Sequence, residues 1–314
     1  MIRLSLGTAI ELGILNKKSD IPPTTAYIMI GDKCNNNCAF CSQSTDSNTR
    51  RDKLSRVIWP EHSNEEILNA FKNYKGLNIK RICIQSMASN DAHETVKEFI
   101  EYIKDDIDLP ISLSAKLESK DDIEKFFSYG VDKIGIAIDA ANKDLYESIK
   151  GNDYNEKIEF VTDMAMKYPG KISTHIIVGL GESHEDIYKL YNYLIENKVT
   201  VSLFAFTPVK GTKMEKIDQP SIESYRRVQL MVYMIDRGYS QDNFKFEKGY
   251  LKDIKISENI KQDINKGYPF EIRGCKDCNR PYYNERPGST IYNYSRSLNQ
   301  EEINKSIKEL NLYI

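Results

Sequence analysis

The sequence lacks an excess of charge of either sign. Of its 314 residues, 44 are Lys or Arg and 46 are Asp or Glu, which leaves a formal net charge of −2. A broad cationic field is what draws many proteins to nucleic acid and to anionic lipid. Because this field is absent, we expect neither a nucleic acid nor a membrane as partner.

Long apolar runs and a secretion signal are missing as well. No stretch reaches the roughly 18 apolar residues of a membrane-spanning helix. Segment 1–20 is moderately apolar, but Glu11 interrupts it and no cleavage site of small residues follows. We therefore expect a soluble, cytoplasmic protein. In that compartment the six cysteines are better explained as reduced ligands than as a disulfide framework.

Short apolar runs rich in β-branched residues recur along the chain. Each is short enough to be a buried strand, and segments with helical patterns separate them. The runs cover residues 25–30, 79–85, 111–115, 132–138, 172–179 and 201–206.

Helix signals follow several of these runs. Ser63 and Glu66 have the spacing of a capping box, and Ser183 and Asp186 repeat it before a second apolar-periodic segment. Residues 221–237 place their apolar side chains on one side of a helix. Strands that alternate with helices pair in parallel through right-handed crossovers. The sequence thus predicts an α/β fold, a TIM-like (β/α) barrel that is complete or partial.

The composition changes near residue 250. Residues 1–250 carry the alternation and are predicted to form the barrel domain. Residues 251–314 turn polar and irregular, and the stretch GCKDCNRPYYNERPGS is dense in turn formers and cysteine. We predict that this part is a C-terminal extension that carries cysteine ligands.

Three cysteines stand close together in KCNNNCAFCSQS, residues 33–44. Cys34, Cys38 and Cys41 directly follow the first strong strand run, and in a (β/α) barrel the loops after the strands carry the chemistry. Three thiolates are one short of a closed tetrahedral set, so a position stays open for a small molecule. A structural zinc site or a set of buried thiols is the alternative.

The spacing CxxxCxxC, with the aromatic Phe40 before the third cysteine, resembles the cluster loop of radical S-adenosylmethionine (SAM) enzymes. The resemblance implies that Cys34, Cys38 and Cys41 hold a 4Fe-4S cluster and that Phe40 lies near the adenine of bound SAM. It also implies cleavage of SAM to a 5′-deoxyadenosyl radical, with the electron from a donor such as ferredoxin or flavodoxin.

Residues 25–250 resemble biotin synthase and its relatives more narrowly. The segment IIVGLGES, 176–183, is similar to their motif beside the adenosyl moiety, which makes Gly179, Gly181 and Glu182 candidate cofactor contacts. The alternative for this segment is an ordinary strand-to-helix turn. IAIDA, 136–140, resembles the segment whose aspartate binds the ribose, which makes Asp139 a candidate.

A second set of three cysteines remains. Cys83 stands where biotin synthase carries one ligand of an auxiliary iron-sulfur cluster, while serines and a lysine replace the partner ligands, at Ser112, Ser173 and Lys245. The pair Cys275 and Cys278 offers a replacement from the tail. With Cys83 it is predicted to hold an auxiliary iron-sulfur cluster, of the 4Fe-4S type. Half of a zinc knuckle or a redox dithiol is the alternative for the pair. The candidates for a fourth ligand are Arg280, Arg286, Ser289, Ser295 and Ser297.

Two clusters in one barrel resemble the sulfur-inserting members of the superfamily. The segment 273–294, together with 54–60 and the N-terminus, resembles a biotin-synthase-related subunit of two-component lipoyl synthases. That resemblance implies an octanoylated carrier protein or peptide as substrate and a second radical SAM subunit as partner, with Tyr282 and Tyr283 as candidate residues at the mouth. A biotin-type insertion into a free small molecule, a non-catalytic iron-sulfur or zinc assembly subunit, and methylthiolation of transfer RNA remain alternatives.

Overall fold

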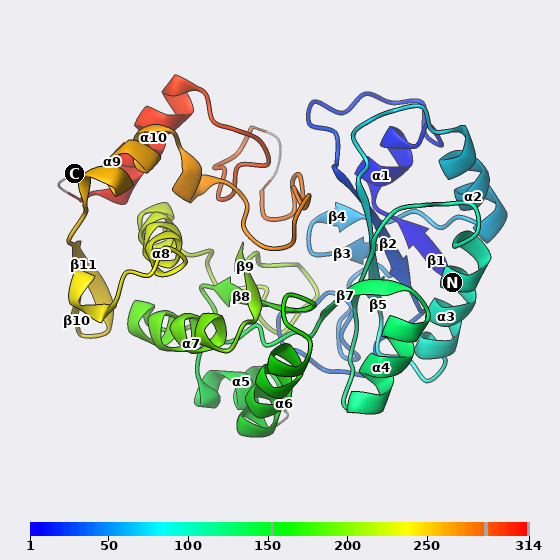
Figure 1. Ribbon diagram of the computed structural model, residues 1–314, viewed down its shortest axis with the longest axis horizontal. Coiled ribbons are helices and arrows are strands. Elements are labelled where there is room, and N and C mark those ends of the chain that lie inside the picture. Colours follow the sequence, from blue (N-terminus) through cyan, green and yellow to red (C-terminus); the bar gives the residue numbers. More distant parts are fainter. Residues whose placement is uncertain (152, 286–287, 313–314) are drawn as a thin grey trace.

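The computed structural model describes residues 1–151, 153–285 and 288–312. Figure 1 shows a curved arrangement of strands with helices around it and a C-terminal part that returns toward the strands. The strands are β1 Ile2–Leu4, β2 Thr25–Ile30, β3 Lys53–Leu54, β4 Val57–Ile58, β5 Arg81–Ser86, β6 Ile111–Ser114, β7 Val131–Gly135, β8 Ile172–Val178, β9 Thr200–Ala205, β10 Phe244–Glu247 and β11 Tyr250–Ile254.

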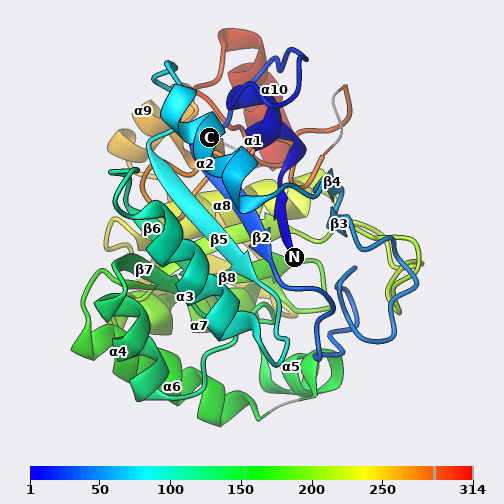
Figure 2. The ribbon, with the colours of Figure 1, turned by 90° about the vertical axis from the view of Figure 1, so that its right-hand side faces the viewer.

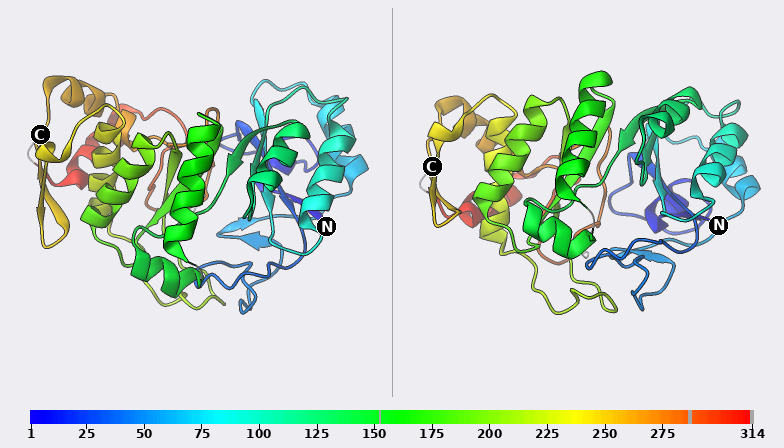
Figure 3. Two further views of the ribbon diagram at one scale, coloured as in Figure 1. Left: turned by 60° about the horizontal axis from the view of Figure 1, so that its bottom comes forward. Right: turned by 90° about the horizontal axis from the view of Figure 1, so that it is seen from below.

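The helices lie mostly between successive strands of the main sheet. They are α1 Leu6–Glu11, α2 Asn64–Asn73, α3 Ala92–Ile103, α4 Lys120–Ser128, α5 Lys143–Lys150, α6 Tyr154–Lys167, α7 His184–Glu196, α8 Ile222–Ile235, α9 Glu258–Asn265 and α10 Gln300–Leu310. Short 3-10 turns cover Gln241–Asn243 and Tyr268–Phe270. Figures 2 and 3 show the helices on the outer side of the curved sheet.

The main sheet is an open, partial barrel. Its strand order is β1-β2-β5-β6-β7-β8-β9, and the pairs from β2 to β9 are all parallel. Strand β2 is buried along its whole length, as expected when both faces of a parallel strand are covered. All six strand runs that the sequence predicts are present within a few residues of their expected bounds. The predicted TIM-like α/β fold is therefore confirmed in its partial form.

The predicted capping residues begin their helices. The Ser63 side chain accepts a hydrogen bond from the Glu66 N–H at the start of α2. Ser183 and Asp186 form a reciprocal capping box at the start of α7. Each interaction satisfies a backbone N–H that the first helical turn leaves without a partner. The local signals in the sequence thus fix where these two helices begin.

The C-terminal part shares the core of the barrel. The buried cluster that contains the main sheet also contains Phe270, Tyr292 and Leu310. The fully buried Arg226 of α8 pairs with Glu309 at 2.9 Å and donates to the backbone carbonyls of residues 291 and 292. These contacts clamp the tail onto α8.

A two-stranded hairpin of β10 and β11 crosses the boundary that the composition change suggests. Residue 250 is the first residue of β11, whose partner strand β10 ends at Glu247, so a boundary there would divide paired strands. The predicted seventh-strand position Lys245 lies exposed on this hairpin and not in the main sheet. Among the described residues, no helix is long and apolar enough to cross a membrane.

Candidate functional site

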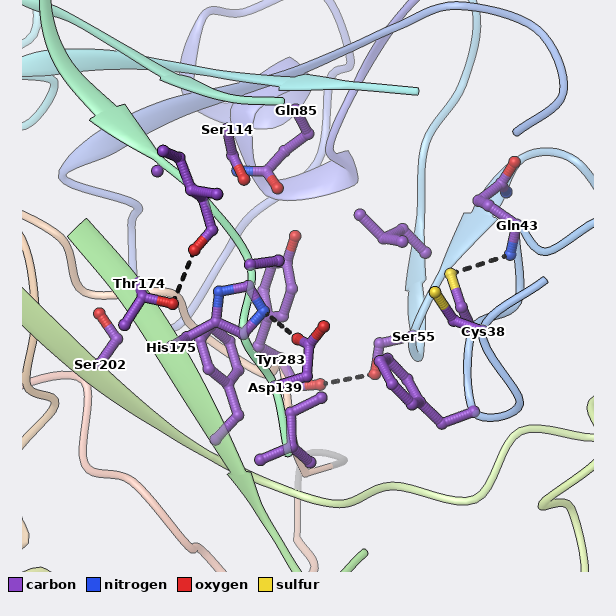
Figure 4. A pocket seen from close by; sticks show the side chains of 18 of the residues that line it. Cys38, Gln43, Ser55, Gln85, Ser114, Asp139, Thr174, His175, Ser202 and Tyr283 are labelled. Carbon is purple, nitrogen blue, oxygen red and sulfur yellow. Dashed lines mark hydrogen bonds and ion pairs between the residues drawn. The ribbon is translucent and has the colours of Figure 1, made fainter. Parts of the chain in front are cut away.

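A cavity of about 370 Å³ lies where the strands of the partial barrel meet the loop after β2 and the tail. Figure 4 shows side chains from several of these elements directed toward this space. The sequence-predicted residues that line it are Cys34, Cys38, Phe40, Cys41, Cys83, Asp139, Cys275, Cys278, Arg280 and Tyr283. Both predicted cysteine sets therefore reach one cavity.

The first cysteine set lies on the loop that follows β2. The Cys41 N–H donates to the Cys38 carbonyl at 3.1 Å, which curls the loop so that its thiols share one side. The Gln43 N–H points at the Cys41 Sγ at 3.4 Å. Burial raises the pKa of Cys38 to about 11 and that of Cys41 to about 12. Because a metal binds the thiolate, loading this loop releases protons that the thiols otherwise keep at neutral pH.

The three thiols of this loop are donors of the kind that bind iron-sulfur clusters. Among the residues that the structure describes, no three His, Cys, Asp or Glu side chains are grouped as ligands of one ion. In a 4Fe-4S cluster each cysteine binds a different iron, so the thiols stand farther apart than around one zinc ion. Cys34, Cys38 and Cys41 would hold such a cluster here.

The second cysteine set is assembled from distant parts of the chain. Cys83 on β5 and Cys278 in the tail pack against the same buried group, which includes Tyr27 and Trp59. The Tyr27 hydroxyl lies 3.5 Å from the Cys278 Sγ. The Cys275 Sγ lies 4.0 Å from the Ser173 Oγ on β8.

Burial dominates the electrostatics of this second set. It raises the pKa of Cys83 and that of Cys278, and the neighbouring thiols add to the shift. The thiols of Cys83 and Cys278 are thus neutral at pH 7 unless a cationic partner is present. Cys83, Cys275 and Cys278 line the same cavity as the first set.

Ser112 and Ser173, the serines at the positions of two auxiliary-cluster cysteines of biotin synthase, line the same cavity. Ser112 pairs in register with Cys83, and its Oγ accepts from the Arg81 Nη1 at 2.7 Å. Ser173 faces Cys275 as described above. The tail cysteines therefore reach the part of the cavity that these two strand positions line.

Arg280 is the fourth-ligand candidate that reaches the cavity. Its guanidinium stacks 3.9 Å from the Phe204 ring centre, and its charge opposes the burial that raises the pKa of Cys278. Ser289, Ser295 and Ser297 do not line the cavity. Arg286 lies outside the described residues. The arginines near this set are therefore Arg280 of the tail and Arg81 of β5, and neither stands at the hairpin position Lys245.

Asp139 is held by a lysine and a histidine at the cavity wall. It is buried at a backbone φ of +67°, contacts the Lys150 Nζ, and lies 2.6 Å from the His175 Nε2. Burial alone would raise the pKa of this carboxyl, but Lys150 and His175 outweigh it and hold the pKa well below its usual range. Asp139 is therefore a carboxylate at the cavity, as a ribose-binding role needs.

Lys150 and His175 are functional candidates that the sequence did not single out. Lys150 is the last residue of α5 and also donates to the Ala137 carbonyl at 2.8 Å. His175 stands on β8 two residues after Ser173, so the alternation along a strand places both on the cavity side. That alternation was the available signal for His175. Lys150 offered none, because only the fold brings it beside Asp139.

Gly179, Gly181 and Glu182 do not line the cavity. The glycines have φ values of +104° and +126°, and a Cβ on Gly179 would lie 2.7 Å from the Pro220 Cδ. The Glu182 carboxylate accepts from the Gly179 and Leu180 N–H groups at 2.6 and 2.9 Å. This turn is thus closed by its own glutamate before α7, and its contact with an adenosyl group stays a prediction.

Comparison with known proteins places this geometry in a family. The model of the radical SAM superfamily matches residues 28–194, from β2 to the end of α7. The chain belongs to the radical SAM superfamily, whose members use a 4Fe-4S cluster and SAM. It is a radical SAM enzyme with distant similarity to biotin synthases.

Individual relatives are remote. Biotin synthase of Methanococcus vannielii is 27% identical over 202 residues, which is 63% of this chain and 60% of that protein. The uncharacterized protein MJ0785 of Methanocaldococcus jannaschii is 27% identical over 158 residues, covering 49% of this chain and 41% of that protein. The match thus covers less than two thirds of either relative.

A solved structure supports the fold assignment. Methylornithine synthase superposes with a TM-score of 0.53 at 18% identity, covering 67% of this chain and 61% of that one. At this identity the likeness concerns the fold alone.

Proposed function

We propose that this enzyme inserts sulfur into an unactivated C–H bond, as a lipoyl synthase subunit that acts on a protein-bound octanoyl-lysine. The observation that carries the proposal is that two cysteine sets, one on the loop after β2 and one from β5 and the tail, line the same cavity. When bound, the two clusters and SAM would supply a 5′-deoxyadenosyl radical and sulfide.

The side chains of this protein would position SAM and the substrate and would exclude water from the cavity. Cys34, Cys38 and Cys41 hold one end of the cavity, and Phe40 adds an aromatic face beside them. Asp139 is kept charged by Lys150 and His175, which suits it to accept hydrogen bonds from ribose hydroxyls. A reactive primary radical survives only where water is excluded and where the target carbon is held within contact distance.

The second cysteine set and its surroundings would hold the sulfur source. Tyr27 of β2 and Tyr283 of the tail, whose ring centres lie 6.2 Å apart, pack in the same group as Cys278 and Cys83. Arg280 places a permanent cation next to Cys278, which favours an anionic cluster at this point. The tail thus supplies two of the three thiols and one of the two nearby arginines, and β5 supplies the others.

Sulfur insertion into a free small molecule is the second candidate. The similarity to biotin synthases favours it. The serines Ser112 and Ser173, at two auxiliary ligand positions of that group, argue for a different auxiliary site and substrate. A scaffold that only binds metal is less well supported, because Asp139 lies charged in the same cavity.

The test is an anaerobic assay. Reconstituted protein receives SAM, a low-potential donor such as ferredoxin or flavodoxin, and an octanoyl-lysine peptide, with and without a candidate second radical SAM subunit. We expect the peptide to gain sulfur and 5′-deoxyadenosine to form. Free octanamide is the matched substrate control. Sulfur in octanamide but not in the peptide would favour the small-molecule reading, and 5′-deoxyadenosine without any thiolated product would reject sulfur insertion for these substrates.

A further inference from the structure

A second cavity, of about 530 Å³, lies behind the first. Segments 5–23, 53–58, 208–210 and 281–285 contribute its walls. Its lining includes Tyr27, Ser55, Val209 and Tyr283, and all four of these residues also line the first cavity. A single layer of side chains therefore separates the two spaces at this point.

The partition is built around Tyr283. The Tyr283 ring lies between the rings of Tyr27 and Phe204, with centre-to-centre distances of 6.2 and 6.0 Å. The Ser55 Oγ donates to the Tyr283 carbonyl at 3.2 Å, a bond that is drawn as a dashed line in Figure 4. Ser55 and Tyr282 have φ values of +52° and +61°. The backbone of Tyr283 lies on a loop, and its ring packs against one side chain of β2 and one of β9. A rotation of this loop side chain would join the two cavities without a change in the sheet.

The second cavity suits a ligand with an acyl chain. Leu6, Ile10, Val57, Pro208 and Pro281 contribute apolar surface to its walls. Charged residues line other parts of the cavity, namely Lys18, Asp20, Lys53, Arg56, Lys210 and Glu285. The apolar part of this lining suits an acyl group.

Glu285 is a buried carboxyl group in this lining. The side chain is buried, at 7% exposure, and its Oε2 has no hydrogen-bond partner. The backbone N–H of Tyr292 bonds the carboxyl group, yet burial still raises the pKa of Glu285 to about 7. A buried acceptor without a partner costs free energy, which a ligand with an N–H donor recovers on binding.

We propose that the second cavity is the channel through which an amide-linked acyl chain reaches the first cavity, and that Glu285 accepts the hydrogen bond of the amide N–H. This inference rests on the proposed function, because it assumes an acyl chain tethered to a lysine side chain. The amide is the polar group that such an arm carries past the apolar part of the channel. Without an acceptor its N–H would lose its bond to water and gain nothing in return.

Glu285→Gln is the informative variant. The side-chain oxygen of Gln can still accept from the Tyr292 N–H, which leaves the NH₂ group toward the cavity where Oε2 was. A donor then faces the donor of the substrate amide. The fold is retained because the variant keeps the size of the side chain and its backbone contact. Glu98→Gln, at an exposed position on α3, is the matched control.

Binding is measured by fluorescence polarization on the reconstituted protein with SAM, so that the readout does not depend on turnover. The probes are two dye-labelled peptides, one with octanoyl-lysine and one with its N-methylated amide, which lacks the N–H. At pH 8.5, above the pKa of about 7 of Glu285, we expect wild type and Glu98→Gln to bind the N–H peptide about tenfold more tightly than the methylated one, the strength of one hydrogen bond to a charged group. Glu285→Gln is expected to lose this preference.

The outcomes separate the channel from the reaction. A Glu285→Gln protein that keeps the wild-type preference overturns the assignment, and so does a wild type that binds neither peptide or binds both equally. If free octanoate displaces the N–H peptide as well as the unlabelled peptide does, the cavity is a fatty-acid site and the tethered arm is rejected. Preferential binding without sulfur insertion supports the channel and rejects the proposed reaction. If Glu285→Gln inserts sulfur at the wild-type rate, the proposed reaction is supported and the channel is rejected.

Discussion

The two cysteine sets of this enzyme are built in opposite ways. Cys34, Cys38 and Cys41 lie on one short loop, whose own backbone hydrogen bonds curl it beside the cavity. Cys83 and the pair Cys275 and Cys278 meet only because the tail crosses back over the sheet. The first site is therefore a local property of the chain, whereas the second depends on tertiary contacts far from it. Changes to the tail should separate them.

The largest effect is expected from removing a ligand of the local set. Cys38→Ala leaves two thiols on the loop, which cannot hold the cluster that SAM requires. Formation of 5′-deoxyadenosine should fall to the level without enzyme, and sulfur transfer should stop with it. Chromatography of the nucleoside product after anaerobic reconstitution measures this. Normal cleavage of SAM by Cys38→Ala would show that this loop does not hold the cluster that binds SAM.

Removal of a ligand from the second cysteine set should stop sulfur transfer but leave the cleavage of SAM intact. In Cys278→Ala the loop after β2 is unchanged, so 5′-deoxyadenosine should still form. Transfer of sulfur to the octanoyl-lysine peptide should be lost, because the second set no longer has three thiols. Both products are quantified in the same reaction mixture. If Cys278→Ala transfers sulfur at the wild-type rate, the second cluster is wrongly assigned.

A smaller effect is expected from loosening the tail without touching a cysteine. The Asn279 side chain accepts from the Thr24 N–H at 2.9 Å and donates to the Pro22 carbonyl at 2.9 Å, which ties the CxxC segment to the start of β2. Asn279→Ala should cost about 1–3 kcal/mol of unfolding free energy and lower the iron bound at the second set while SAM cleavage persists.

Iron analysis and urea unfolding test this variant. Asn73→Ala, on the exposed side of α2, is the control, since its side chain donates only to the Asn69 carbonyl within the same helix. Equal iron content in Asn279→Ala and Asn73→Ala would mean that this tie does not position the second set.

The smallest expected effect is a pH dependence of hairpin docking. His184 accepts from the Leu251 N–H at 3.1 Å, and burial lowers its pKa from 6.5 to about 4. The unfolded chain therefore binds a proton between these values that the folded chain does not, and stability should fall as the pH drops from about 6.5 to 4. His184→Gln should flatten this part of the profile.

Urea unfolding at pH 5 and at pH 7.5 measures the difference. The loss for wild type should be on the order of 1–2 kcal/mol and smaller for His184→Gln. An identical slope in both proteins would assign the acid sensitivity to other groups.

The same contrast explains what could be read from the sequence. The six parallel strands and the caps at Ser63 and Ser183 follow from local patterns, and the structure confirms them. Strand β1, with three residues, is too short for a periodic signal, and it is held by antiparallel pairing with β2. The hairpin of β10 and β11 was missed because its pattern is weak and the predicted boundary was drawn through it.

Some residues of the candidate site could be predicted from a local motif, and others could not. The spacing of Cys34, Cys38 and Cys41 predicts a cluster loop without any knowledge of the fold. The ion pair of Lys150 with Asp139 joins a helix end to a strand end, and no short motif records such a meeting. Arg280 was one of five candidates for a fourth ligand, and only the path of the tail places it beside Cys278.

The most direct test of the two-site account is a count of iron and sulfide per chain after anaerobic reconstitution of wild type, Cys38→Ala and Cys278→Ala. The account predicts about eight irons for wild type, as two four-iron clusters require, and about four for each variant. Two different remaining clusters should be visible by electron paramagnetic resonance, only one of which responds to SAM. Four irons in wild type, lost entirely in Cys38→Ala and retained in Cys278→Ala, would contradict it.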